Sequence, residues 1–404
     1  MVLKLIVTFY ICTTILVCRA TKLELGFGRA LSGNLFLVKQ KDMANFDQNN
    51  INYSSFDKTV KRSDELEKDL KLNPYRHRVL TGDRPTGNLH IGHYFGSLQN
   101  RVRLQELGVE TFILIADYQV LTDRDVFNDI SRYVTELTLD YLACGLDPLK
   151  KPTYIFPHSY IPELNQLTIP FLSLVSNAEL SRNPTIKEEI EASGQSVINA
   201  GMYTYPVHQA ADILFCKSDV VPVGKDQLPH IEMTRTIARR FNKKFNVKVF
   251  KEPVGLLSEM PVILGLDGLQ KMSKSRNNSI MIKSTEDETN KLIKSAKTDS
   301  ERFIEYDPVK RQEVANLLRL TSLCSNEPPE RIASEIGNQG SGKLKQITSE
   351  AINSYFKTIR LRRKELENDK IFVSEILKKG IHQAREVAIE TLGEVRKAMN
   401  MEIS

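Results

Sequence analysis

Short apolar runs alternate with stretches of helical spacing between residues 77 and 223 of this 404-residue chain. Four of these runs have the length and composition of buried strands, at residues 77–81, 111–116, 153–157 and 220–223. Between them, apolar residues recur at helical spacing from residue 90 to 107 and from residue 126 to 142. This alternation favours an α/β fold, in which helices cover both faces of a parallel sheet.

The pattern changes after residue 307, where helical spacing continues without any strand-like run. We therefore expect residues 75–306 to form a catalytic α/β domain, with a mobile loop in its second part, residues 266–306. Residues 307–404 are expected to form a separate helical lobe. Ligands of parallel α/β sheets bind at the carboxyl ends of the strands, so the loop after the first strand is the expected place for chemistry.

The N-terminal region has a different character. Lys4 precedes an apolar run over residues 5–17, which is typical of a signal peptide at residues 1–20; an N-terminal anchor is the alternative. Residues 21–74 are polar and weakly periodic, which predicts a disordered, transit-like leader and order from about Tyr75. Such a leader resembles the bipartite signals of secondary plastids such as the apicoplast, with secretion or the mitochondrion as alternatives. We expect the mature form to have no membrane attachment.

Composition adds a few limits. The chain is 41% hydrophobic and 26% charged, as in ordinary globular proteins. Its net charge of +6 suits a polyanionic partner without requiring one. None of the five cysteines has the spacing of a CxxC motif or a metal site, which argues against a disulfide framework and against a zinc or iron–sulfur centre.

The first candidate for chemistry is the tetrad His90-Ile91-Gly92-His93. On a helix, His90 and His93 share one face, and in its first turn free backbone N–H groups favour phosphate. Two imidazoles there donate hydrogen bonds that strengthen as charge builds on phosphate oxygens. Gly92 leaves room for a ribose or an adenine. The alternative is a pair of surface histidines, but the strand–loop–helix context favours a phosphate site.

The second candidate is the loop Lys271-Met272-Ser273-Lys274-Ser275, which follows a glycine-containing stretch. A cationic, hydroxyl-bearing loop of this kind can close over a triphosphate and neutralise the leaving pyrophosphate. Taken alone, it also fits a solvated run of charges. Together with the upstream histidine tetrad, in this order, it indicates two halves of one ATP site.

These two motifs resemble the HIGH and KMSKS elements of class I aminoacyl-tRNA synthetases. Residues 79–299 resemble bacterial-type tryptophanyl-tRNA synthetases, with further likeness in Thr81–Gly87, Ile115–Gln119, Tyr205–Asp212 and Val221–Gln227. The resemblance implies a Rossmann-like catalytic domain followed by an α-helical anticodon-binding domain, in a homodimer. It also implies ATP with Mg²⁺, L-tryptophan and tRNA(Trp) as ligands, with no metal site on the protein itself.

The resemblance also implies roles for single residues. Asp212 would accept the indole N–H, Tyr205 and Gln227 would hold the ammonium end, and Gln209 would belong to the tryptophan pocket. A carboxylate suits indole, whose single polar atom is a donor, and such a bond contributes about 1.5–3 kcal/mol. The alternative for Asp212 is a helix-end carboxylate paired with an arginine. The remaining roles are catalysis by His90, His93, Lys271 and Lys274, and ATP binding by Arg84, Gly92, Asp226, Met272, Ser273 and Ser275.

Several positions depart from the family pattern or stay ambiguous. His208-Gln209 replaces a common Leu-Met pair, Lys225 replaces an acid, and Arg84 stands where Gln is common. Lys187 is a weak phosphate candidate on what is otherwise a solvated helix face. The cluster Arg360, Arg362, Arg363 and Lys364 has a solvated face as its favoured interpretation, with tRNA contact as the alternative.

The predicted reaction is the ATP-dependent formation of tryptophanyl-adenylate, followed by transfer to the terminal adenosine of tRNA. Catalysis would come from positioning and electrostatic stabilisation, without a covalent nucleophile on the protein. The alternatives are a tyrosyl-tRNA synthetase, which shares both ATP motifs, and a synthetase-like protein that only binds tRNA. Nucleotidylyltransferases with an HxGH helix are smaller and lack the 205–212 segment.

Overall fold

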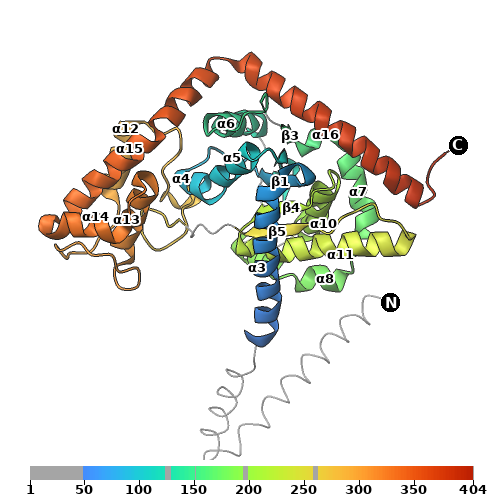
Figure 1. The fold of residues 1–404 in the computed structure, drawn as a ribbon, viewed down its shortest axis with the longest axis horizontal. Coiled ribbons are helices and arrows are strands. Elements are labelled where there is room, and N and C mark those ends of the chain that lie inside the picture. Colours follow the sequence, from blue (N-terminus) through green and yellow to red (C-terminus); the bar gives the residue numbers. More distant parts are fainter. Residues whose placement is uncertain (1–48, 123–128, 151, 194–198, 258–262, 404) are drawn as a thin grey trace, which may run out of the picture. The chain divides into compact units, whose positions relative to one another are not determined.

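The structure is a computed structural model that describes residues 49–122, 129–150, 152–193, 199–257 and 263–403. Within these residues, one parallel sheet has the strand order β3-β2-β1-β4-β5. Figure 1 shows the sheet surrounded by helices. The strands are β1 (Arg78–Asp83), β2 (Glu110–Ile115), β3 (Thr153–Pro157), β4 (Val220–Val223) and β5 (Val254–Leu257). The predicted α/β class and the four predicted strands are confirmed.

The fifth strand, β5, was not predicted. It has only four residues, and Gly255 in its interior weakens the strand signal. The structure explains this glycine, because a Cβ there would lie 3.1 Å from Val223 Cγ2 and 3.2 Å from Leu228 Cδ2. Close packing against β4 and the following helix therefore favours glycine at this position, and the glycine weakens the hydrophobic pattern by which a strand is predicted.

Successive side chains of the strands enter two different cores. In β2, Ile113 and Ile115 belong to one buried cluster, and Phe112 and Leu114 belong to another. Period-two alternation sends neighbouring residues to opposite faces of a sheet. Both faces of this sheet are apolar and covered, which confirms the predicted helices on both sides.

The helices of the first two thirds of the chain connect these strands. The helix predicted from residue 90 is α4 (Ile91–His93), which continues through a π-helical turn at Tyr94–Leu98 into α5 (Gln99–Glu106). π-Helical turns are rare in proteins, and those that occur are often found at functional sites. The others are α6 (Ile130–Ala143), α7 (Pro162–Leu172), α8 (Asn177–Arg182), α9 (Pro184–Ser193), α10 (Ala200–Leu214) and α11 (Leu228–Phe245).

The later part of the chain is helical, as predicted, with α12 (Glu286–Ser295), α13 (Gln312–Ser325), α14 (Pro329–Ile336), α15 (Gly340–Glu367) and α16 (Lys370–Ala398). These helices also pack against the α/β part of the chain. Leu317 and Phe356 share a buried cluster with Ile113 of β2. Helix α16 lies against β3 so closely that a Cβ at Gly380 would collide with the Ile155 carbonyl oxygen. None of the described helices combines the length and the apolar character needed to cross a bilayer.

A helix lies where the sequence predicted a disordered leader. Helix α3 spans Asn49–Leu72, and from Thr59 onward one face of it is buried. Leu66 and Leu70 share a cluster with Val79 of β1 and Leu256 of β5. The prediction of a disordered leader up to residue 74 is therefore wrong for this helix. The predicted signal peptide, residues 1–20, lies outside the described residues.

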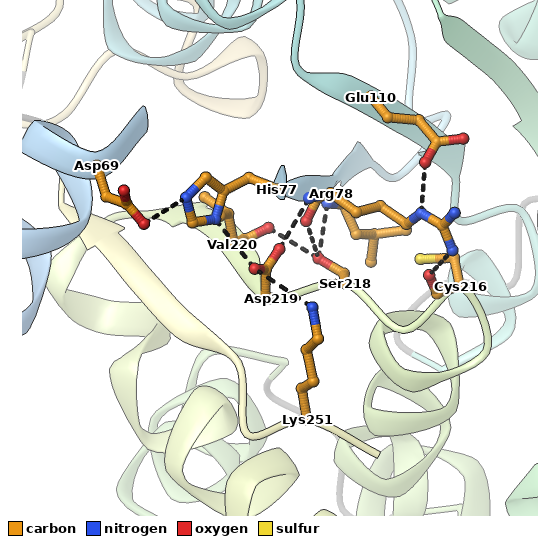
Figure 2. A network of polar contacts seen from close by, with 10 residues as sticks. Asp69, His77, Arg78, Glu110, Cys216, Ser218, Asp219, Val220 and Lys251 are labelled. Atoms are coloured by element: carbon orange, nitrogen blue, oxygen red, sulfur yellow. Dashed lines mark hydrogen bonds and ion pairs between the residues drawn. The ribbon is translucent and has the colours of Figure 1, made fainter. Parts of the chain in front are cut away.

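Polar contacts fix the end of α3 to the sheet (Figure 2). The two ring nitrogens of His77 lie 2.9 Å from Asp69 Oδ2 and 3.0 Å from Asp219 Oδ2. The other Asp219 oxygen accepts the Arg78 backbone N–H at 2.8 Å. Hydrogen bonds from Asn73 and His77 lower the pKa of Asp69. Since Asp219 directly precedes β4, this network also joins the beginnings of β1 and β4.

Replacing Leu70 with alanine should destabilise the whole chain, because this fully buried side chain fills space under β1 and β5. The expected cost is about 2–5 kcal/mol in the free energy of unfolding. Urea unfolding measures it, with Leu72→Ala as the matched control, because Leu72 is 77% exposed on the same helix. Equal effects of the two changes would contradict the assignment of α3 to the core.

Candidate active site

A cavity of about 330 Å³ opens at the carboxyl ends of β1, β2 and β4. The strand order reverses between β1 and β4, which is where ligands bind in open parallel sheets. Its walls come from the ends of these strands and from α10. Five residues predicted from the sequence line it together: Arg84, Tyr205, Gln209, Asp212 and Gln227.

Asp212 is the buried acid of this cavity, with only 2% of its surface exposed. Its Oδ1 lies 3.0 Å from Nδ1 of His158, and its Oδ2 accepts a hydrogen bond from Gln119 Nε2 at 3.3 Å. No arginine pairs with it among the described residues, so the alternative of an arginine-paired carboxylate is wrong. The role of His158 was not predicted, because it comes from a different part of the chain with no motif around it.

Tyr205 is held from behind by a buried histidine. Its hydroxyl lies 3.0 Å from Nε2 of His230, which is fully buried at the beginning of α11. Burial lowers the pKa of His230 to about 4, although the charge of Asp226 opposes the shift. The imidazole is therefore neutral near pH 7, and it fixes the phenol ring of Tyr205 against the cavity.

The two histidines of the first motif stack at the beginning of α4. His90 has an extended backbone one residue before the helix, and its ring centroid lies 3.6 Å from that of His93. The His90 backbone N–H donates to Nδ1 of His93 at 3.1 Å, which leaves the His93 proton on Nε2. Nδ1 of His90 is buried and has no partner among the described residues.

Burial, more than nearby charge, favours the neutral forms of these rings. Burial lowers the pKa of His90 to about 2, helped by the charges of His93 and Lys274. Burial also lowers the pKa of His93 to about 4, although the Asp83 carboxylate opposes the shift. Burial alone would raise the pKa of Asp83, but Arg101, whose Nη1 donates to Asp83 at 2.6 Å, brings it to about 2. Asp83 thus carries its charge between the cavity and the histidines.

The two ATP motifs lie against each other, as predicted. Lys274 Nζ donates to the Thr86 carbonyl oxygen at 3.1 Å, next to the loop that leads to His90. A Cβ at Gly92 would lie 3.4 Å from Met272 Cβ. The Ile91 backbone N–H also donates to the Ile280 carbonyl oxygen at 3.0 Å. The segment that carries the second motif is therefore in contact with the first motif and with the loop before it.

Some predicted residues occupy other places. The Met272 side chain is only 3% exposed and belongs to the hydrophobic core, so its predicted contact with ATP would come from the backbone. The Ser273 and Ser275 hydroxyls lie 3.0 Å apart on the loop, and Lys271 is exposed. Asp226 is exposed beside the cavity, where its Oδ2 accepts from Gln227 Nε2 at 3.1 Å.

The departures from the family pattern also have definite places. His208 does not line the cavity, and its Nε2 lies 2.7 Å from Asn165 Oδ1 behind the wall. Gln209 does line it. Lys225 and Lys187 are exposed and outside the cavity lining.

One member of the basic cluster, Arg363, is buried and structural, contrary to the prediction of a solvated face, whereas Lys364 is exposed. Arg363 on α15 is 2% exposed, and its Nε donates to Asp140 Oδ1 of α6 at 2.6 Å. The other Asp140 oxygen accepts the Leu89 backbone N–H at 2.8 Å. Burial raises the pKa of Asp140, although Arg363 opposes the shift. This buried pair holds the loop directly before His90.

Comparison with known proteins now adds to this geometry. The family model described as tRNA synthetases class I (W and Y) matches residues 73–357. The chain belongs to this family of synthetases. Its match runs from the beginning of the sheet into α15, so the cavity and both ATP motifs lie within the matched residues.

The synthetase is similar to bacterial proteins named tryptophan–tRNA ligase. It is 43% identical over 332 residues to that of Clostridium longisporum and 42% identical over 335 residues to that of Lactococcus lactis. Each match covers 80% of this chain and 97% of the relative. Its fold matches the tryptophanyl-tRNA synthetase of Campylobacter jejuni, solved with ADP and tryptophan. That TM-score is 0.70 and the identity 32%, over 80% of this chain and 99% of the other.

The histidines of this synthetase should make its stability depend on pH. In the folded chain His93 takes up a proton only near pH 4, whereas an unfolded histidine does so near pH 6.5. The unfolded state therefore binds more protons in this window, and stability falls as the pH decreases from about 6.5 to 4. Urea unfolding at several pH values should show a shallower decrease for His93→Gln. Parallel curves for the two proteins would contradict this prediction.

Proposed function

We propose that this chain attaches tryptophan to tRNA in two steps, through a tryptophanyl-adenylate. The observation that carries the proposal is the buried Asp212 carboxylate in a small cavity beside two paired ATP motifs. An indole ring presents one N–H donor and otherwise only apolar surface. A site built to bond that donor rejects side chains that lack it, because its buried acceptor would stay unpaired.

The chemistry requires positioning and charge stabilisation. The tryptophan carboxylate attacks the α-phosphate of ATP, and pyrophosphate leaves with the electron pair of the broken P–O bond. His93 keeps a proton on Nε2 and, like His90, is neutral, so both act as hydrogen-bond donors or acceptors to phosphate oxygens without changing charge. Lys271 and Lys274 supply the positive charge for the pyrophosphate. Gln227 and Tyr205 line the cavity where the amino group of the substrate would lie.

Magnesium is expected to enter with ATP. Among the described residues, one group of three side chains has metal-ligating atoms close together, and it consists of His158, His208 and Asp212. Its two imidazoles do not suit Mg²⁺, which prefers oxygen ligands and is often held mainly by substrate phosphates. The polar side chains of the two ATP motifs themselves are imidazoles, lysines and serine hydroxyls, with no carboxylate among them. They fit a metal carried by the triphosphate, and we assign no protein ligand to it.

The partners proposed for the chain are tRNA(Trp), L-tryptophan and ATP. The helical part after residue 307 would take the anticodon end of the tRNA, as the family likeness suggests. We also propose a homodimer, which light scattering during size-exclusion chromatography tests directly. A monomer at micromolar concentration would contradict this part of the proposal.

We propose an organellar address, a plastid of secondary origin such as the apicoplast, with the mitochondrion as the alternative. The support is the apolar run followed by a polar stretch at the N-terminus. The buried face of α3 adds a limit, because cleavage after Thr59 would remove core residues. A fluorescent reporter fused after residue 48 tests the address, and a diffuse cytosolic signal would contradict it.

ATP–pyrophosphate exchange with each amino acid tests the function. The protein should retain α3, since the helix contributes to the core. Exchange should depend on tryptophan, and charging of tRNA(Trp) should follow. Exchange driven by tyrosine would favour the tyrosine enzyme, and tRNA binding without any exchange would favour the non-catalytic alternative.

A further inference from the structure

We infer that His158 is a positioning residue that aims the Asp212 carboxylate and thereby sets the preference for a ring with an N–H donor. The inference deepens the proposed function and depends on it. His158 is fully buried on the short turn after β3 and is absent from the residues that line the cavity. It therefore acts on the substrate only through Asp212.

The hydrogen bonds of His158 determine where its proton lies. Its Nε2 accepts the Tyr118 backbone N–H at 2.9 Å, so this nitrogen must carry a lone pair. The neutral ring then has its proton on Nδ1, which donates to Asp212 Oδ1 at 3.0 Å. Asp117 Oδ1 lies 3.4 Å from Nε2, but the Tyr118 amide occupies that lone pair. The Tyr118 backbone N–H, in the turn after β2, thus selects the His158 tautomer that donates to Asp212.

Both oxygens of Asp212 are fixed by these neighbours. His158 bonds one oxygen and Gln119 Nε2 the other, at 3.3 Å. A carboxylate has about four lone-pair sites, so two donors hold its plane while further sites stay available to an indole N–H. Without His158 the carboxylate would keep a single protein donor and lose a defined orientation.

The imidazole itself is held in place by packing. Its ring centroid lies 4.8 Å from that of His208 and 5.4 Å from that of Tyr118. His208 is in turn fixed by Asn165, whose Oδ1 lies 2.7 Å from His208 Nε2. A metal ion bound by His158 Nδ1 would displace the proton that bonds Asp212. The observed contacts therefore favour a hydrogen-bonded arrangement over a metal site.

Removal of the His158 Nδ1 donor should reduce the preference of the enzyme for tryptophan over an analogue without the indole N–H. Tryptophan should lose roughly 10- to 100-fold in kcat/KM, in line with one weakened hydrogen bond to a charged group. An analogue with sulfur in place of the indole N–H makes no such bond, so its kcat/KM should change little. The ratio of kcat/KM for tryptophan to kcat/KM for the analogue therefore reports on the orientation of the Asp212 carboxylate. A general loss of structure would lower both kcat/KM values together.

The experiment compares His158→Met with His158→Gln in the otherwise unchanged chain. The two side chains are similar in size, but only glutamine can donate to Asp212. We expect the ratio of kcat/KM for tryptophan to that for the analogue to fall strongly in His158→Met and to stay close to the wild-type value in His158→Gln. The KM for ATP should be unchanged in both variants. Ile161→Val, which keeps an apolar side chain at a fully buried position shortly after His158, is the control and should keep the ratio.

Two results would overturn the inference: a wild-type ratio in His158→Met, or equal losses in both variants. If wild-type protein shows no tryptophan-dependent exchange, the proposed function fails instead, and the variants are not needed to see this. Should His158→Met not fold, nitrogen NMR of wild-type protein decides. The ring of His158, assigned through its coupling to the Tyr118 amide, should carry its proton on Nδ1, and a proton on Nε2 would overturn the inference.

Discussion

Replacing Lys274 with methionine should lower kcat/KM for tryptophan activation by about 10²–10³-fold, the usual effect of removing one donor that stabilises transition-state charge. Lys274 Nζ lies 3.1 Å from the Thr86 carbonyl oxygen and close to the stacked histidines, whose pKa values its charge lowers. In the proposed reaction its charge would stabilise the negative charge that builds on the leaving pyrophosphate. ATP–pyrophosphate exchange measures the effect.

Arg276→Met gives the matched control, because Arg276 is exposed on the same loop and bonds the Lys271 carbonyl oxygen only at 3.5 Å. Its loss should alter kcat/KM by less than about threefold, as for a screened surface charge. Comparable losses in the two variants would mean that the total charge of the loop matters, and not the position of Lys274.

Replacing Arg363 with methionine should reduce the free energy of unfolding by about 3–5 kcal/mol, the cost of leaving a buried charge without its partner. Asp140 has no exposed surface, and Arg363 Nε donates to it at 2.6 Å. Arg363 Nη2 also donates to Glu136 at 2.7 Å, so one side chain joins α15 to two acids of α6. Urea unfolding measures the loss.

Lys364→Met, an exposed change at the next position, should cost almost nothing. The double change Asp140→Leu with Arg363→Met removes both buried charges and should recover much of the loss, because the desolvation cost goes with them. If the double change is as unstable as the two single changes combined, the pair does not act as a unit.

The sheet could be predicted because most of its strands are uninterrupted apolar runs, and the ATP motifs because their residue types and order are distinctive. Helix α3 could not be predicted in the same way. Its buried positions are Thr59, Ser63, Leu66 and Leu70, which have helical spacing, but two of the four are polar. Only two of these four positions therefore contribute to a hydrophobic pattern in the sequence. The Ser63 hydroxyl oxygen accepts the Leu257 backbone N–H at 3.0 Å, which explains a polar residue on the buried face.

Contacts between distant segments explain the other misses. Asp212 could be placed in the pocket from its motif, yet its partner His158 lies after a different strand, and only the sheet brings them together. Arg363 lies in a run of charged residues that looks solvated in the sequence. It is buried because α15 presses it against Asp140 on α6, which no local pattern reveals.

The position of α16 has a consequence for how the chain matures on the ribosome. Strand β3 lies at one edge of the sheet, and α16, which crosses it at Gly380, follows all the other described helices in chain order. An uncovered edge strand offers unpaired backbone groups to other chains. During synthesis this edge therefore stays open until α16 emerges. Premature termination before Lys370 would leave it as a permanent site for aggregation, even though every residue of the cavity and both ATP motifs had already been made.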